Sequence, residues 1–214
     1  LALRGSRSAE GCSFLVDLEP NVLALQSALR SGEYRPGAYR SFLIHEPKVR
    51  LISAAPFVDR VVHHSVCHHL EPMFERFSIY DSYACRTGKG LHRAVLRAQR
   101  FSRRWPAFLK LDIKHFFESA DHEVLRRQLR YKVKDPRLLS LCDVIIGSNA
   151  PGSDLGRGLP IGNLTSQFFA NYYLSFLDRW VKQSLRVKGY VRYMDDFVLW
   201  GDSLDGLMRL RDQV

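Results

Sequence analysis

The chain has 214 residues, 46% hydrophobic and 25% charged, which excludes a disordered or collagen-like protein. No apolar run reaches the roughly 18 residues that a membrane span requires, and the N-terminal residues do not resemble a signal peptide. Thirty-two Lys and Arg against 22 Asp and Glu give a formal net charge of +10, which favours a polyanionic partner such as nucleic acid. The four scattered cysteines form no Cys-x-x-Cys pair and predict reduced thiols in a cytosolic protein.

The first 104 residues alternate between helical and extended patterns. The predicted elements are a helix over 18–30 that ends at Gly32, extended runs over 34–44 and 49–53, a helix over 58–71, an irregular stretch over 80–90 and a helix over 91–104.

The last of these helices carries four arginines on one face, at positions 93, 97, 100 and 104. The segment has no Asp or Glu, so no acidic residue at the usual i, i+4 spacing neutralises these charges. Two interpretations stay open, a solvated surface and a stripe that follows a phosphate backbone. Like charges without partners favour the second.

The second half of the chain begins with a strand over 108–113, in which alternation places Asp112 opposite the apolar face. The later predicted elements are a helix capped by Asp121, a helix near Pro136, a Gly- and Pro-rich loop over 147–163, a helix over 164–185, a hairpin of 190–194 with 197–200, and a helix near 203–213.

Asp195 and Asp196 are an unusual pair for the tip of a hairpin, where Asn-Gly or Asp-Gly is preferred. Two carboxylates about 4 Å apart repel by about 4 kcal/mol at an effective dielectric near 20, and Asp112 from a neighbouring strand adds to this. Divalent cations relieve the repulsion, and hard oxygen ligands that leave room for phosphates suit Mg²⁺. The pattern predicts a two-metal site for phosphoryl transfer.

Three motifs resemble those of reverse transcriptases. Residues 193–196 (Tyr-Met-Asp-Asp) resemble the signature box, 111–117 the motif that supplies the first metal-binding aspartate, and 158–167 the loop and helix that contact template and nucleotide. Their order and spacing also agree. The resemblance continues upstream through 47–52 and 83–90.

This resemblance implies an α+β, right-hand polymerase fold with fingers over 1–106 and a palm over 107–214, part of 125–158 packing with the fingers. The palm is expected to be a split β-α-β (ferredoxin-like) antiparallel sheet with helices on one face. The thumb that follows in the family is expected to be absent from this chain.

The resemblance also assigns roles to single residues. Asp112, Asp195 and Asp196 are implied to be catalytic and, with the Ile113 carbonyl, to hold two Mg²⁺ ions. The implied nucleotide-binding residues are Lys48 and Arg50 at the triphosphate, Phe117 as a steric gate beneath the sugar, Ile161 and Gly162. The implied template-binding residues are Arg86, Lys89, Arg93, Arg97, Arg100, Arg104, Leu159, Pro160, Ser166 and Gln167. Either Phe116 or Phe117 is alternatively a core residue.

Ile161 and the pair Ser166-Gln167 resemble reverse transcriptases of diversity-generating retroelements, whereas most others have Gln and many have Ser-Pro at these places. Group II intron and retron enzymes are the alternative. The subfamily implies error-prone copying of template RNA into cDNA on a primer–template from deoxynucleoside triphosphates. It also implies a small basic accessory protein, no membrane partner and a cytoplasmic location in a bacterial, archaeal or phage-encoded system.

Two other functions stay open, a non-catalytic RNA-binding module and a metal nuclease. A non-catalytic RNA-binding module does not require three acidic residues, which repel phosphates. A metal nuclease leaves Lys48 and Arg50 unexplained. A zinc site at His63, His64, His68 and His69 lacks a second, distant ligand pair, so a polar helix face or a nucleic-acid contact is the preferred interpretation of these histidines.

Overall fold

The computed structural model describes residues 8–45, 48–148 and 155–213. The chain divides into two compact units. Unit 1 comprises Leu1–Glu71 and Phe117–Gln167, and unit 2 comprises Pro72–Phe116 and Phe168–Val214. The units are therefore interleaved along the chain, and residues 125–158 belong to the same unit as the N-terminal residues.

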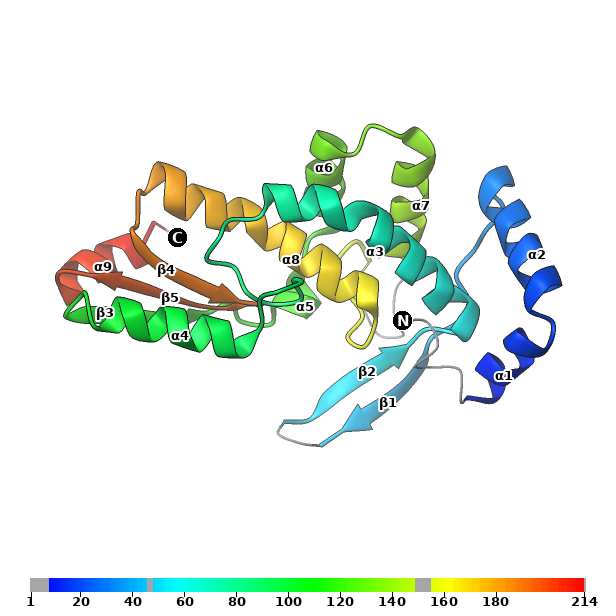
Figure 1. The fold of residues 1–214 in the computed structure, drawn as a ribbon, viewed down its shortest axis with the longest axis horizontal. Coiled ribbons are helices and arrows are strands. Elements are labelled where there is room, and N and C mark those ends of the chain that lie inside the picture. The colour runs from blue at the N-terminus through cyan, green and yellow to red at the C-terminus, as the bar shows by residue number, and fades with distance from the viewer. Residues whose placement is uncertain (1–7, 46–47, 149–154, 214) are drawn as a thin grey trace. The chain divides into compact units, whose positions relative to one another are not determined.

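Helices and strands are both present, as expected for an α+β protein, and Figure 1 shows them in order. The elements are α1 (Ala9–Val16), α2 (Leu18–Ser31), β1 (Arg40–Ile44), β2 (Arg50–Ala54), α3 (Phe57–Phe77), α4 (Leu91–Ser102), β3 (Ala107–Asp112), α5 (Phe116–Ser119), α6 (His122–Lys132), α7 (Pro136–Gly147), α8 (Leu164–Arg179), a π-helical turn (Trp180–Ser184), β4 (Gly189–Tyr193), β5 (Asp196–Gly201) and α9 (Leu204–Arg211). Within the described ranges, no helix is long and apolar enough to cross a membrane.

Local signals explain several helix ends in unit 1. Helix α2 ends at Gly32, whose φ of 76° is in the left-handed region that favours glycine. The side chains of Asp121 and Asp135 accept hydrogen bonds from the first N–H groups of α6 and α7. Helix α1, capped by Ser8, was not predicted from the sequence. The Gly- and Pro-rich loop over 147–163 is only partly described, because residues 149–154 lie outside the described ranges, as does Pro47 of the upstream motif.

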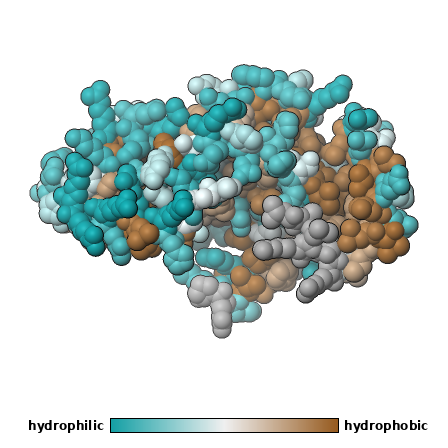
Figure 2. All heavy atoms as spheres, in the orientation of Figure 1, coloured by the Kyte–Doolittle hydropathy of each residue, from teal (hydrophilic) through white to brown (hydrophobic). Residues whose placement is uncertain are grey.

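Strands β1 and β2 of unit 1 form an antiparallel hairpin in which Arg40 pairs with Ala54 and Ile44 with Arg50. Apolar side chains are exposed on this hairpin and on helices α1 and α2, and Figure 2 shows hydrophobic atoms over the two helices at the right. Among the large apolar side chains of α1 and α2, the largest exposed fractions are 80% at Val16 and 55% at Leu23.

Unit 2 is built round an antiparallel sheet with the strand order β3-β5-β4. On one face, Tyr190, Phe197 and Leu199 pack with Val181 of the π-helical turn and Leu207 of α9. The sheet is antiparallel, as the resemblance implies.

The opposite face of the sheet is covered by α4. Val191 and Trp200 pack there with Ala94 and Phe101 of α4, and with Tyr83. The expectation of helices on one face only is therefore wrong. The reason is visible in β4 and β5, which carry apolar residues on both faces and so need cover on both.

Candidate active site

The three predicted aspartates lie at one end of the unit 2 sheet. Asp112 is the last residue of β3 and Asp196 the first residue of β5, and the strand register makes them direct partners. Directly opposed residues of an antiparallel pair point to the same face, with Cβ atoms about 4.5–5.5 Å apart. Asp112 is exposed and Asp196 half-buried, so the two carboxylates share an accessible face.

Asp195 lies in the turn between β4 and β5. The tip of the hairpin is Met194-Asp195 and not Asp195-Asp196, because Asp196 pairs with Tyr193 and belongs to β5. Met194 has a φ of 55°, a left-handed conformation that costs a non-glycine residue about 1–2 kcal/mol. The N–H of Ile113 donates to the carbonyl oxygen of Asp195 at 3.4 Å, so the turn is joined to the end of β3.

Lys110 compensates part of the negative charge on this face. Its Nζ lies 2.9 Å from Oδ1 of Asp196, and the hydrogen bond and charge of that carboxylate raise the pKa of Lys110. Lys110 precedes Asp112 by two positions in β3, so alternation puts both side chains on one face. This alternation is visible in the sequence, although Lys110 is not among the predicted site residues.

Carboxylate oxygens on this face suit Mg²⁺ chemically, because the ion prefers hard oxygen ligands and commonly takes only one or two from carboxylates. Among residues 8–45, 48–148 and 155–213, however, no three His, Cys, Asp or Glu side chains are grouped to hold a metal ion. The strand register thus brings Asp112 and Asp196 together, and a backbone contact joins the turn of Asp195 to β3, without gathering three carboxylates at one point.

The loop before α8 forms a second candidate region, in unit 1, where it packs against β2. The carbonyl oxygen of Ile161 accepts a hydrogen bond from the N–H of Ser53 at 2.8 Å. The buried side chain of Asn163 accepts from the N–H of Ala55 at 3.2 Å and donates to the carbonyl of Ser53 at 2.9 Å. Asn163, which the sequence did not single out, therefore fixes Ile161 beside β2.

Gly162 allows the close approach of this loop to β2. Its φ is 114°, and a Cβ atom there would lie 2.7 Å from Cγ2 of Ile52. On the other side of the loop, the N–H of Leu159 donates to the carbonyl of Phe117 at 2.6 Å. Phe117 is half-buried while Phe116 is buried, so the structure distinguishes the two rings that the sequence left interchangeable.

Of the remaining nucleotide candidates, Lys48 lies two residues before β2 and Arg50 is its first residue, and both are exposed. Unit 1 therefore holds every residue of that predicted set: Lys48, Arg50, Phe117, Ile161 and Gly162.

The family model for reverse transcriptase (RNA-dependent DNA polymerase) matches residues 44–214, a range that includes both candidate regions. The chain belongs to the reverse transcriptase family. The resemblance stated from the motifs is confirmed at the level of the family.

Two curated relatives of this chain are themselves much longer. It is 27% identical over 174 residues to the group II intron-encoded protein LtrA of Lactococcus lactis subsp. cremoris, covering 77% of the chain and 29% of that protein. It is 24% identical over 172 residues to the protein YkfC of Escherichia coli strain K12, covering 74% of the chain and 45% of that protein. The chain thus spans less than half the length of these relatives.

Solved structures of telomerase share the fold of this chain. Telomerase from Candida albicans, in complex with a fragment of telomeric RNA, matches 89% of the chain and 43% of that protein with a TM-score of 0.57 at 11% identity. Apo telomerase from Candida tropicalis matches 90% of the chain and 50% of that protein with a TM-score of 0.56 at 12% identity. The α+β fold expected from the sequence is confirmed.

Several basic residues predicted to bind the template have partners inside unit 2. Arg86 forms a salt bridge with Glu75 at 2.5 Å, which holds the pKa of Glu75 below its usual value, and the Arg86 side chain is only 9% exposed. Lys89 donates to the carbonyl of Tyr80 at 2.8 Å and lies over its ring. Arg86 and Lys89 therefore stabilise the stretch before α4.

The arginines of α4 differ from one another. Arg97 pairs with the buried Asp81 at 2.8 Å, so the expectation that the stripe lacks an acidic partner is wrong at that position. The partner comes from the loop before the helix, which helical spacing could not reveal. Arg93, which donates to the carbonyl of Gly88, is exposed, and so is Arg100. Arg104 is also exposed but lies beyond α4, which ends at Ser102 rather than at the predicted residue 104.

The template candidates of the loop and α8 also divide by burial. Leu159 and Ser166 are 4% and 3% exposed, so their side chains are buried. Pro160 is half-buried and Gln167 exposed. Of these four side chains, only the last two are accessible to a template.

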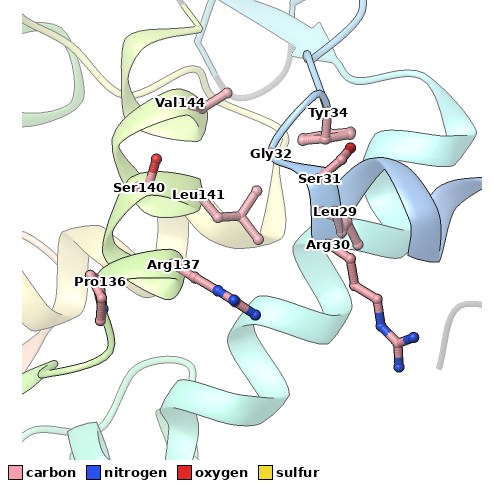
Figure 3. A pocket seen from close by; sticks show the side chains of 10 residues that line it. All are labelled: Leu29, Arg30, Ser31, Gly32, Tyr34, Pro136, Arg137, Ser140, Leu141 and Val144. Carbon is pink, nitrogen blue, oxygen red and sulfur yellow. The ribbon is translucent and has the colours of Figure 1, made fainter.

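A pocket of about 330 Å³ lies within unit 1 between the end of α2 and α7. Figure 3 shows Leu141 of α7 pointing toward Leu29 of α2, and Arg30 and Arg137 also line the pocket. No candidate residue of the reverse transcriptase chemistry lines it, and the three aspartates belong to unit 2. We therefore assign this pocket no part in the reaction.

The predicted polar helix face is wrong for His63. Its side chain is 1% exposed, and neither ring nitrogen has a hydrogen-bond partner. Burial lowers the pKa of His63 to about 4. His63 is therefore a neutral core residue at pH 7.

Acidification is expected to destabilise the fold through His63. In the unfolded chain this residue is protonated near pH 6.5, and in the folded chain only near pH 4. Its contribution to the free energy of unfolding is therefore fully present above pH 6.5 and is lost as the pH falls from 6.5 toward 4. Within this range the free energy of unfolding decreases by up to about 1.4 kcal/mol per pH unit. Urea unfolding at pH 7 and pH 5 checks this. His63→Leu should reduce the pH dependence and His68→Leu, at an exposed position, should not; equal pH dependence in all three proteins contradicts the prediction.

Proposed function

We propose that this chain forms the fingers and palm of an RNA-directed DNA polymerase. The β1–β2 hairpin is then part of the fingers, and β3, β4 and β5 form the palm sheet. In the reaction, the primer 3′-hydroxyl attacks the α-phosphate of a deoxynucleoside triphosphate and pyrophosphate leaves. The reaction extends cDNA along a template RNA, which the net charge of +10 favours as a partner.

The observation that carries this proposal is the direct pairing of Asp112 with Asp196, beside a turn that holds Asp195. In the proposal these carboxylates, with the carbonyl of Ile113, hold two Mg²⁺ ions next to the primer end. When bound, Mg²⁺ supplies activation of the attacking hydroxyl and stabilisation of the leaving oxygen. Lys110 neutralises Asp196 and keeps the excess negative charge on this face low.

The nucleotide is assigned to unit 1 residues. Lys48 and Arg50 are exposed and are proposed to hold the triphosphate, Arg50 with two parallel hydrogen bonds and Lys48 as a point charge. The backbone of Phe117 is hydrogen-bonded to Leu159, two residues before Ile161 in the same loop, which supports a joint role at the sugar and base.

Primer extension tests the proposal. With a DNA primer annealed to RNA, deoxynucleotides and Mg²⁺, the full protein is expected to extend the primer, and a chelator should stop extension. RNA binding without any extension favours the non-catalytic RNA-binding module. Metal-dependent cleavage of the nucleic acid without extension favours the nuclease.

Within the family, we propose the diversity-generating retroelement type, because of Ile161 and the Ser166-Gln167 pair. The similarity to LtrA favours a second candidate, a group II intron-type enzyme. A template repeat and variable repeat next to the gene would support the first candidate, and an intron RNA structure round the gene would support the second. The small basic accessory protein and the cytoplasmic location depend on the first candidate.

Replacing Ile161 by glutamine is expected to lower the error frequency at template adenines. An isoleucine offers shape and dispersion only, and a site without specific hydrogen bonds separates similar ligands by only about 1–3 kcal/mol. We expect a decrease of about tenfold, measured by sequencing cDNA copied from a defined RNA. Ile52→Gln, on the neighbouring strand, is the control for added polarity. An unchanged error frequency in Ile161→Gln refutes the role of this residue.

A further inference from the structure

Arg192, in β4, is a buried arginine two residues before the turn of the candidate active site. Its side chain is 1% exposed, and that of Asp178 in α8, its partner, is fully buried. The two groups form a two-pronged pair, with Nε to Oδ1 and Nη2 to Oδ2 both at 2.7 Å. Tyr190 also donates to Asp178, at 2.6 Å. One side of the guanidinium is thus anchored firmly to α8.

The other side of the guanidinium holds the turn. Nη1 of Arg192 donates to the carbonyl oxygen of Met194 at 2.8 Å and to Oδ1 of Asn171 at 3.1 Å. Asn171 in turn donates to the carbonyl of Ala84 at 3.2 Å, so its amide has a defined orientation. The held carbonyl belongs to the residue immediately before Asp195.

Stability alone gives a weak reason for this arrangement. Taking two charges out of water costs about as much as their attraction returns, so a buried ion pair is often no better than an apolar pair of the same volume. Met194, however, has a left-handed φ of 55°, and such a conformation persists only where its surroundings enforce it. The hydrogen bond from Arg192 to the carbonyl of Met194 is a contact that does so.

We propose that Arg192, oriented by Asp178 and Asn171, is a positioning residue that fixes the Met194-Asp195 turn and thereby the Asp195 carboxylate. This inference rests on the proposed function, because it assigns Asp195 to metal binding. Arginine is required because lysine cannot pair with Asp178 through two nitrogens and also reach Met194.

Metal binding and stability together test the proposal, with the full protein and Mn²⁺ as the spectroscopic probe. Arg192→Lys tests the guanidinium, and Asn171→Ala removes an acceptor for Nη1 while the pair with Asp178 remains. We expect both to weaken Mn²⁺ binding, measured by electron paramagnetic resonance, about 10- to 100-fold. We also expect kcat to fall similarly with the KM for the deoxynucleotide unchanged.

Tyr190→Phe is the matched control. It removes a hydrogen bond from the same buried carboxylate without touching the turn, so it should lower the melting temperature and leave Mn²⁺ affinity unchanged. Unchanged Mn²⁺ affinity in folded Asn171→Ala overturns the positioning role, as does an equal loss of affinity in Tyr190→Phe. If the unmodified protein extends primers while the variants keep their affinity, the proposed function stands and this inference fails. If the unmodified protein neither binds Mn²⁺ nor extends primers, the proposed function and this inference both fail.

Discussion

Replacing Asp195 by asparagine is expected to lower the rate of nucleotide incorporation about a thousandfold, and Asp112→Asn is expected to do the same. Asparagine keeps the size of the side chain and removes its charge, so the fold is retained while a ligand for the metal is weakened. Loss of a single group that stabilises charge in an active site typically costs 10²- to 10³-fold in kcat. Primer extension under single-turnover conditions measures the change.

In these variants the melting temperature is expected to change independently of the rate of nucleotide incorporation. Like charges directly opposite each other in a sheet destabilise it, so Asp112→Asn, which removes one charge of the pair with Asp196, should keep or raise the melting temperature. Asp202→Asn, at an exposed position just after β5, makes the same chemical change outside the site and should leave the rate unchanged. Full activity of Asp195→Asn excludes the polymerase assignment of this turn.

Replacing Phe117 by valine is expected to increase incorporation of ribonucleotides relative to deoxyribonucleotides. In the proposed function the ring lies beneath the sugar, where it clashes with a 2′-hydroxyl, and a smaller side chain removes that clash. A steric contact of this size is worth about 10- to 200-fold in discrimination. The ratio of kcat/KM for paired ribo- and deoxynucleotides measures the effect.

Phe116→Val is the matched control for that substitution. Phe116 is 4% exposed and contacts the ring of Tyr173, so its truncation should destabilise the fold through lost packing and leave sugar selectivity unchanged. If Phe116→Val changes the selectivity and Phe117→Val does not, the gate has been assigned to the wrong ring.

Much of the local structure follows from short-range signals. Gly32 ends α2, Asp121 and Asp135 begin two helices, and alternation in 108–113 gives a strand with Asp112 on its exposed face. These signals act over a few residues, because caps and strand alternation depend on neighbours in the chain. They suffice to predict most of the elements, but not the short helices α1 and α5.

The sequence by itself determined most of the elements and the family, because each depends on residues close together in the chain or on motifs in a fixed order. It also supplied the three aspartates as candidates for the site. Only the tertiary structure decided that Asp112 pairs with Asp196 in the sheet and that Lys110 forms an ion pair with Asp196. It also decided that Asp81 forms an ion pair with Arg97 and that Arg192 donates to the carbonyl of Met194. The hydrogen-bond partners of Arg192 alone range from Met194, 2 positions away in the chain, to Ser82, 110 positions away. Strand register and core packing select such partners from many alternatives, and no local pattern marks them.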